Sequence, residues 1–180
     1  MNLSERYQKE IRQKLQKQLG LKNINSVPKL EKVKVNIGIG TYMKNNKNYD
    51  EIANNIEMIT GQRPVVSKSR IAISNFKLRI GMPVGLSVTL RKQKMYDFMD
   101  RLINIVLPRV RDFQGTSPKS FDQKGNYNLG LKDCSVFPEL NIEDISKIHG
   151  LQITITTTAE NPEHGKALLT EMGFPFKKNN

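Results

Sequence analysis

Two segments of the sequence carry polar side chains at every second position, with aliphatic residues between them. A period of two is typical of a β-strand that has one buried and one exposed face. Lysine and arginine neutralise phosphates, whereas asparagine, serine and threonine hydrogen-bond ribose 2′-hydroxyls and base edges. The alternation therefore predicts two neighbouring strands whose exposed face binds RNA. The polar residues are Lys32, Lys34 and Asn36 in the first segment and Ser87, Thr89 and Arg91 in the second.

The residue types on this face favour one kind of RNA. Gly38, Gly85 and Ser87 are expected to keep the surface low, so that a nucleic-acid backbone can approach closely. No aromatic residue falls on the exposed positions of either segment. This argues against a base-stacking platform and against sequence-tolerant single-strand binding, and it favours a folded, A-form-like RNA. Ordinary outward-facing polar residues are the alternative explanation for Asn36 and Thr89 taken alone.

The net charge of the chain is concentrated in its first half. The 180 residues include 29 Lys+Arg and 17 Asp+Glu, a net charge of +12. Residues 1–92 hold 18 basic and 6 acidic residues, whereas residues 93–180 hold 11 of each. No acidic residue lies between Glu57 and Asp97. Such asymmetry indicates a polyanionic partner, with a solvated basic face as the alternative.

No arrangement of nucleophiles, acids or metal ligands predicts catalysis. His149 and His164 are fifteen residues apart, and with Cys134 as the single cysteine they do not form a zinc site of the usual spacing. We expect both histidines at the surface or in turns, and Cys134 as a packing residue. Residues 125–130 have the glycine spacing of a phosphate-binding loop, but Leu131 stands where that motif requires a lysine, so we expect no such loop there. We therefore predict no catalytic residue, no metal and no cofactor.

Two other functional classes fit the sequence less well. An RNA-processing enzyme needs titratable groups beside the basic face, and the acid-free stretch from 58 to 96 disfavours it. A peripheral binder of anionic membranes needs a helix with a large apolar face. The stripe in residues 3–19 is narrow and lacks Trp and Phe. We expect no membrane span and no signal peptide, and the single cysteine fits a reducing compartment.

Hydrophobic spacing predicts an α+β fold over residues 1–180 as a single domain. Apolar residues at helical spacing predict three helices, ended by Gly20, Gly61 and Pro108, and the N-cap signals at 161–163 predict a fourth, ended by Gly173. Period-two patterns and β-branched residues predict strands at 32–39, 84–91, 126–131, 132–137 and 150–158, and residues 44–48 are predicted to form a loop. Elements of this kind favour an antiparallel sheet with helices packed on one face and an open polar face for RNA.

Several segments, in one order and without large gaps, resemble the universal large-subunit ribosomal protein number five family, the 5S rRNA binders, in its bacterial or organellar type. The likeness runs from about residue 3 to residue 177. The matching segments are 36–40, 60–64, 76–81, 88–91, 107–113, 121–128, 137–139, 150–159 and 173–176. Departures are mild: Tyr96 stands where a tryptophan is common, and the Asn- and Lys-rich stretch 44–48 is idiosyncratic.

The resemblance implies a non-enzymatic constituent of the large ribosomal subunit, cytoplasmic, that attaches 5S rRNA in the central protuberance. It implies an N-terminal RNA-binding segment at 24–80 and a C-terminal segment at 84–177. It matches Asn36, Gln62 and Thr89 to positions that hydrogen-bond 5S rRNA. Apart from the resemblance, five basic residues are expected to release counterions from that RNA; these are Lys32, Lys34, Arg63, Lys68 and Arg91.

The resemblance also implies partners beyond 5S rRNA. The loop around 76–83 matches one that approaches the elbow of P-site tRNA, with Lys77, Arg79, Gly81 and Met82 as the contacting residues. An intersubunit bridge to small-subunit ribosomal protein thirteen is implied for the charge-balanced second half. The remaining implied partners are 23S rRNA and neighbouring large-subunit proteins.

Overall fold

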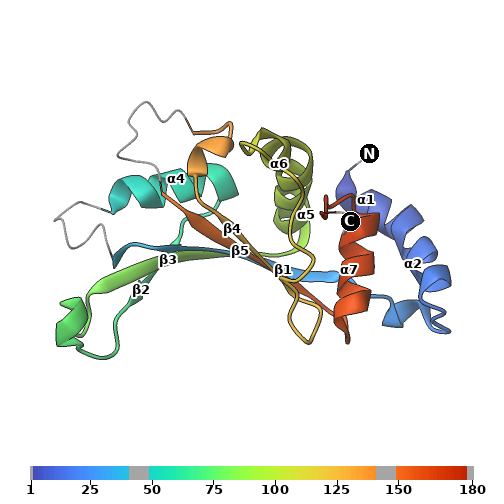
Figure 1. The fold of residues 1–180 in the computed structure, drawn as a ribbon, viewed down its shortest axis with the longest axis horizontal. Helices are drawn as coiled ribbons and strands as arrows, with labels where there is room; N and C mark the ends of the chain where they lie inside the picture. The colour runs from blue at the N-terminus through green and yellow to red at the C-terminus, as the bar shows by residue number, and fades with distance from the viewer. Residues whose placement is uncertain (1, 41–48, 141–148, 178–180) are drawn as a thin grey trace. The chain divides into compact units, whose positions relative to one another are not determined.

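The computed structural model describes residues 2–40, 49–140 and 149–177 (Figure 1). The predicted loop at 44–48 therefore lies outside the described residues. The elements in chain order are α1 (Leu3–Arg6), η1 (Tyr7–Ile11), α2 (Arg12–Gln18), η2 (Ile24–Ser26), β1 (Leu30–Gly38), α4 (Asp50–Thr60), β2 (Val65–Lys68), η3 (Ser74–Phe76), β3 (Pro83–Leu90), α5 (Lys92–Arg101), η4 (Leu102–Val106), α6 (Leu107–Arg109), β4 (Tyr127–Leu131), η5 (Cys134–Val136), β5 (Leu151–Thr157) and α7 (Pro162–Glu171).

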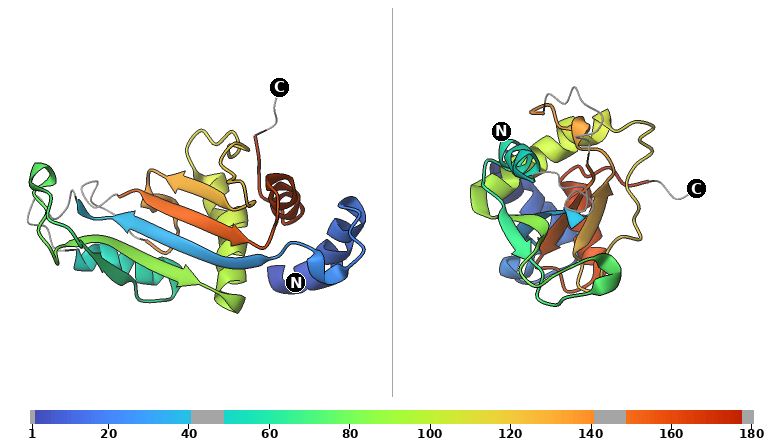
Figure 2. Two further views of the ribbon diagram at one scale, coloured as in Figure 1. Left: turned by 90° about the horizontal axis from the view of Figure 1, so that it is seen from below. Right: turned by 90° about the vertical axis from the view of Figure 1, so that its left-hand side faces the viewer.

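The strands form one five-stranded sheet in the order β2-β3-β1-β5-β4. The arrows of β1 and β4 run opposite to those of β3 and β5, so the sheet is antiparallel (Figure 2). The predicted α+β class with an antiparallel sheet is confirmed. Backbone packing divides the chain into two compact units. The first unit comprises Met1–Val33, Leu90–Leu129 and Thr154–Asn180, and the second comprises Lys34–Thr89 and Gly130–Ile153.

The second unit buries one side of its strands. Val35 and Ile37 of β1 and Leu86 and Val88 of β3 are each at most 2% exposed. The apolar stripe of α4 is buried as well, and this helix lies on one side of the strands of its unit (Figure 1). Gly61, at φ +65°, ends α4 and donates its N–H to the carbonyl of Glu57. The predicted helix and its glycine terminator are confirmed, because only a residue that tolerates a left-handed backbone ends a helix in this way without strain.

The N-terminal helical segment, residues 3–18, packs into the first unit through one stripe of apolar side chains. Leu3, Tyr7, Ile11 and Leu15 are each at most 6% exposed, as their four-residue spacing predicts. An α-helix repeats every 3.6 residues, so such a stripe drifts around a regular helix. The wider π turn η1 over Tyr7–Ile11 counteracts that drift and keeps the four side chains on one face. The hydroxyl of Tyr7 donates to the carbonyl of Pro28 at 2.9 Å, and burial raises the pKa of Tyr7 to about 12.

Three sequence predictions about single elements are wrong. Residues 132–137 do not form a strand: Asp133 accepts the N–H of Ser135 at 2.7 Å and starts the short helix η5, and β4 lies beside β5 instead. Pro108 does not itself end its helix, because the helical segment of α5, η4 and α6 continues through it and ends one residue later, at Arg109. His149 is 4% exposed, not a surface residue, because it packs on the buried Cys134.

None of the described helices is long and apolar enough to cross a membrane.

Candidate RNA-binding surface

The polar positions of β1 and β3 in the second unit alternate with buried positions, so they lie on the opposite side of the strands from the buried side chains. Lys34 is exposed, and Asn36, Ser87 and Thr89 are half-buried, whereas their chain neighbours are buried. The two strands are hydrogen-bonded neighbours, and the N–H of Ile39 donates to the carbonyl of Val84 at 3.0 Å. The predicted orientation of these side chains is confirmed. We call this side of β1, β2 and β3 the open face.

The pairing of β2 adds two residues that the sequence did not reveal. Val65 lies opposite Ser87 and Ser67 lies opposite Gly85, so both belong to the open face. Val65 is 68% exposed, which is unusual for a valine in a sheet. The sequence of 63–76 contains β-branched residues but no alternation long enough to define their faces. Only the register with β3 assigns them.

Gln62 and Arg63 precede β2, Lys68 is its last residue, and all three side chains are exposed. The hydroxyl of Thr60 donates to the carbonyl of Ile56 at 2.7 Å and accepts the backbone N–H of Gln62 at 3.3 Å. The backbone of Gln62, just before β2, is therefore hydrogen-bonded to the last turn of α4, while the amide side chain of Gln62 stays exposed. Lys68 follows a register irregularity between Ser67 and Lys68 and lies opposite Pro83 of β3.

One glycine does not have the expected role. Gly85 is buried, and a Cβ placed on it would lie 3.3 Å from the carbonyl oxygen of Ile37. The expectation that Gly85 lowers the exposed surface is therefore wrong, because its missing side chain serves the close approach of two strand backbones. Gly38 is exposed, and a Cβ on it would meet nothing within 4 Å. Gly38 keeps the edge of the open face low, as expected.

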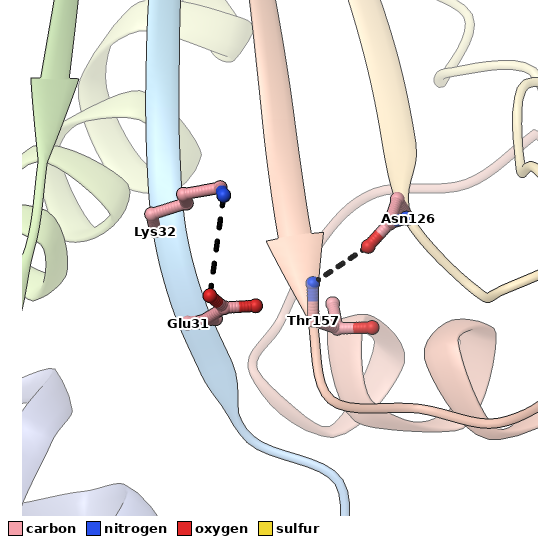
Figure 3. Close-up of polar contacts among 4 residues, drawn as sticks. All are labelled: Glu31, Lys32, Asn126 and Thr157. Carbon is pink, nitrogen blue, oxygen red and sulfur yellow. Dashed lines mark hydrogen bonds and ion pairs between the residues drawn. The ribbon is translucent and has the colours of Figure 1, made fainter.

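Two predicted RNA contacts belong to the first unit. Lys32 lies at the start of β1, and its ammonium is 3.9 Å from the carboxylate of Glu31 (Figure 3). Both side chains are substantially exposed, so this ion pair holds Lys32 only weakly. Arg91 is exposed and precedes α5 as its N-cap residue.

Figure 3 also shows the side chain of Asn126 accepting the backbone N–H of Thr157 at 3.0 Å, which joins the ends of β4 and β5.

The predicted tRNA-contacting loop is a hydrogen-bonded hairpin that extends from the ends of β2 and β3 (Figure 2). Its base is closed by Ser69, whose N–H donates to the carbonyl of Met82 at 2.8 Å and whose carbonyl accepts the N–H of Gly81 at 2.9 Å. Lys77, at φ +54°, turns the chain between the paired residues Ile73 and Leu78. Lys77, Arg79 and Gly81 are exposed, and Met82 is half-buried.

The hairpin also exposes apolar side chains, which the sequence analysis did not single out. Ile71, Phe76 and Ile80 are 68%, 58% and 72% exposed, respectively. They share residues 69–82 with three cations and no acid. A shallow hollow is lined by Ala72, Ser74, Lys77, Leu78 and Arg79. The hairpin therefore presents both apolar surface and positive charge to whatever it contacts.

The described residues contain no group of acidic, histidine and cysteine side chains suited to a metal ion. The nearest approach to a reactive pair is Cys134 with His149, whose Sγ and Nδ1 are 3.5 Å apart. Both residues are buried, and burial raises the pKa of the Cys134 thiol. A buried neutral thiol is a poor nucleophile, so this pair is a packing contact.

Comparisons with known proteins cover nearly the whole chain. The family model described as "Ribosomal protein L5" matches residues 23–79, and the model of the C-terminus of the same ribosomal family matches residues 83–176. Proteins named large ribosomal subunit protein uL5 are similar throughout. The one from Natranaerobius thermophilus is 55% identical over 174 residues, which is 97% of each chain. That from Prochlorococcus marinus is 50% identical over 179 residues, covering 99% of this chain and 100% of its own.

Proposed function

This chain belongs to the ribosomal protein L5 family, and from this premise we propose that it is a structural constituent of the large ribosomal subunit that binds 5S rRNA through the open face. The family is one of structural components and not of enzymes. The observation that supports the open face is the placement of Asn36, Ser87 and Thr89, which are half-buried between buried chain neighbours on two adjacent strands. Half-buried polar groups lose little side-chain entropy on binding and can make directed hydrogen bonds.

Two groups of residues contribute differently to the proposed binding. Asn36, Gln62 and Thr89 supply hydrogen bonds to riboses, bases or both, and these bonds depend on position. Lys34, Arg63 and Lys68 neutralise phosphates and release counterions, and this contribution depends on salt. Lys32 and Arg91, in the first unit, are proposed to add to the second group. Val65 offers an apolar contact beside Ser87 that neither group provides.

The variants Asn36→Ala and Thr89→Ala are expected to weaken 5S rRNA binding by about 1–3 kcal/mol each, with an unchanged dependence on salt. The reason is that each removes a directed hydrogen bond and no phosphate contact. Lys34→Ala is expected to lower the slope of log affinity against log salt by about one unit and to weaken binding to many RNAs. Filter binding of 5S rRNA and an unrelated folded RNA, at several salt concentrations, measures both quantities.

Matched controls come from exposed residues of the same unit that lie off the open face. Asn54→Ala, on α4, removes an asparagine side chain as Asn36→Ala does, and Lys132→Ala, after β4, removes a lysine side chain as Lys34→Ala does. Neither control is expected to change 5S rRNA affinity by more than about twofold, since surface substitutions away from a site are close to neutral. The reverse pattern, in which Thr89→Ala changes the salt slope and Lys34→Ala changes only affinity, contradicts the proposed roles.

We propose further that the hairpin 69–82 contacts tRNA at the P site. Replacing residues 71–80 with a two-glycine turn leaves the Ser69–Met82 closure in place. This variant is expected to bind 5S rRNA as tightly as the unaltered protein, because it keeps the strands of the open face. Ribosomes that carry it are expected to hold P-site tRNA less tightly, as measured by tRNA dissociation rate. Loss of 5S rRNA binding in this variant would show that the hairpin and the open face do not have separate functions.

An intersubunit bridge to small-subunit protein thirteen and contacts with 23S rRNA and neighbouring large-subunit proteins complete the proposal. The bridge is assigned to residues 93–180, where basic and acidic side chains are equal in number. A charge-balanced surface suits a protein partner better than a polyanion.

A further inference from the structure

The N-terminal helical segment presents a cationic surface that the open face does not include. Its apolar stripe is packed into the first unit, and the exposed side chains of the segment lie on its polar side. The exposed side chains Arg6, Lys9, Lys14 and Lys17 lie on this polar side, and Lys22 follows in the next loop. None of these five cations forms an ion pair with another residue in the part of the chain that the structure describes.

The charge on this segment is not balanced locally. No acidic residue occurs between Glu10 and Glu31, a stretch that holds five basic residues. Lys14 and Lys17 are three positions apart, so they share one face of α2 with a rise of about 4.5 Å between them. Like charges at this spacing destabilise a helix by a few tenths of a kcal/mol. A bound polyanion would remove that repulsion.

The loop after α2 is held against the helix in advance of any ligand. The guanidinium of Arg12 donates to the side-chain oxygen of Asn25 at 2.7 Å and to the carbonyl of Ile24 at 3.2 Å. The side-chain amide of Gln16 donates to the carbonyl of Lys22 at 3.4 Å, and the N–H of Leu21 donates to the carbonyl of Gln16 at 3.1 Å. These bonds keep the backbone of Lys22 close to α2, so little loop ordering remains to be done on binding.

We propose that Lys14, Lys17 and Lys22, here called the α2 surface, form a second RNA-binding site that takes the phosphate backbone of a double-helical RNA segment. Closely spaced lysines match a regular array of phosphates, and no aromatic side chain is present there to stack on unpaired bases. A membrane is a poorer match, because the apolar stripe of the helical segment is at most 6% exposed, and among the exposed large apolar side chains of the described residues Ile24, at 39%, is the one near Lys22. The inference rests on the proposed ribosomal function, in which a protein that attaches one RNA to another needs two RNA-binding surfaces.

The test compares two triple variants of the full chain with the same loss of charge. The first is Lys14→Gln, Lys17→Gln and Lys22→Gln. The matched control is Lys119→Gln, Lys132→Gln and Lys166→Gln, which removes three exposed lysines from elsewhere in the described chain. The probes are a mixed-sequence RNA duplex of about 20 base pairs, 5S rRNA, and vesicles containing phosphatidylserine. Binding is followed between about 50 and 200 mM salt.

The α2-surface variant is expected to bind the duplex with a salt slope lower by about 2–3 units, while the control keeps the slope of the unaltered protein. If both variants lose the same amount of salt slope in duplex binding, the effect comes from net charge alone, and the proposal is overturned. Unchanged duplex binding by the α2-surface variant would also overturn it, as would loss of vesicle binding without loss of duplex binding, which would assign the surface to a membrane. If Asn36→Ala and Thr89→Ala leave 5S rRNA affinity unchanged, the proposed function fails, whatever the α2-surface variant does.

Discussion

Replacing Gly165 with alanine is expected to lower the free energy of unfolding by about 3 kcal/mol. Gly165 lies inside α7, where alanine is intrinsically preferred over glycine by about 1 kcal/mol, so helix propensity alone predicts the opposite sign. A Cβ on Gly165 would overlap the carbonyl oxygen of Gly125. Gly125 cannot retreat easily: it has φ +72°, and a Cβ placed on it would lie 2.7 Å from the carbonyl oxygen of Asn161. Urea unfolding followed by circular dichroism measures the change.

The matched control for this effect is Gly130→Ala. Gly130 is exposed in β4, and a Cβ there would meet nothing within 4 Å. Alanine at this position is expected to be neutral or to stabilise by up to about 1 kcal/mol, because it loses less backbone entropy on folding. A destabilisation of similar size in both variants would mean that the contact between α7 and the turn at Gly125 is not the cause.

The second large effect is expected for Tyr127→Ala, with a loss of about 3–5 kcal/mol. Tyr127 is 1% exposed, and its ring centroid lies 4.7 Å from that of Phe121, 5.3 Å from that of Phe174 and 5.6 Å from that of Phe176. Truncation removes one of four rings that pack in edge-to-face and tilted pairs, and it leaves a cavity among the other three. A backbone hydrogen bond lies next to the cluster: Thr116 donates its N–H to the carbonyl of Pro175, which lies between Phe174 and Phe176, at 2.8 Å.

Tyr127→Phe separates packing from hydrogen bonding at the same position. It keeps the ring and loses only the hydroxyl, which donates to the carbonyl of Ser117 at 2.8 Å. The expected cost is about 1 kcal/mol, the usual net value of one hydrogen bond. If the phenylalanine and alanine variants are equally destabilised in thermal unfolding, the hydrogen bond and not the aromatic cluster stabilises this region.

The aromatic cluster gives a physical reason for two of the segments that resemble the ribosomal family. Residues 121–128 and 173–176 are far apart in the chain, yet Tyr127 contacts both Phe174 and Phe176. A bridge between Thr116 and Phe176 joins the second of these segments to the chain shortly before the first. Their aromatic residues are therefore needed to pack the first unit, whereas the segments 36–40 and 88–91 supply polar residues of the open face and 60–64 holds exposed polar residues just before β2. The resemblance thus combines residues required for stability with residues proposed for RNA binding.

The orientation of the open face could be predicted from the sequence because its cause is local. In a strand, successive side chains point to opposite sides, so a period of two assigns Asn36 and Thr89 to one face without knowledge of any neighbour. Glycine terminators are local in the same sense, and Gly61 and Gly173 both have the positive φ that ends a helix. Net charge and its distribution need no structure at all.

Where the sequence analysis failed, the deciding contact was distant. Residues 132–137 resembled a strand in composition, but β4 pairs with β5, which follows much later in the chain, and Asp133 caps a short helix. Gly85 looked exposed by its alternation, yet the backbone of Ile37 lies against it. A pattern of single residues carries no information about which backbone or side chain will come to lie beside them.

The sequence by itself determined the alternating strands, the ends of the helices with their glycines, the basic first half and, through the resemblance, the family. Each of these follows from propensities and periodicities that act within a few residues, or from charge, which needs only counting. The tertiary structure alone decided that Val65 and Ser67 share the open face, that Ile71, Phe76 and Ile80 are exposed on the hairpin, and that Arg12 and Gln16 hold the loop of the α2 surface. These depend on pairing register and burial, which are properties of the packed chain and not of any segment of it.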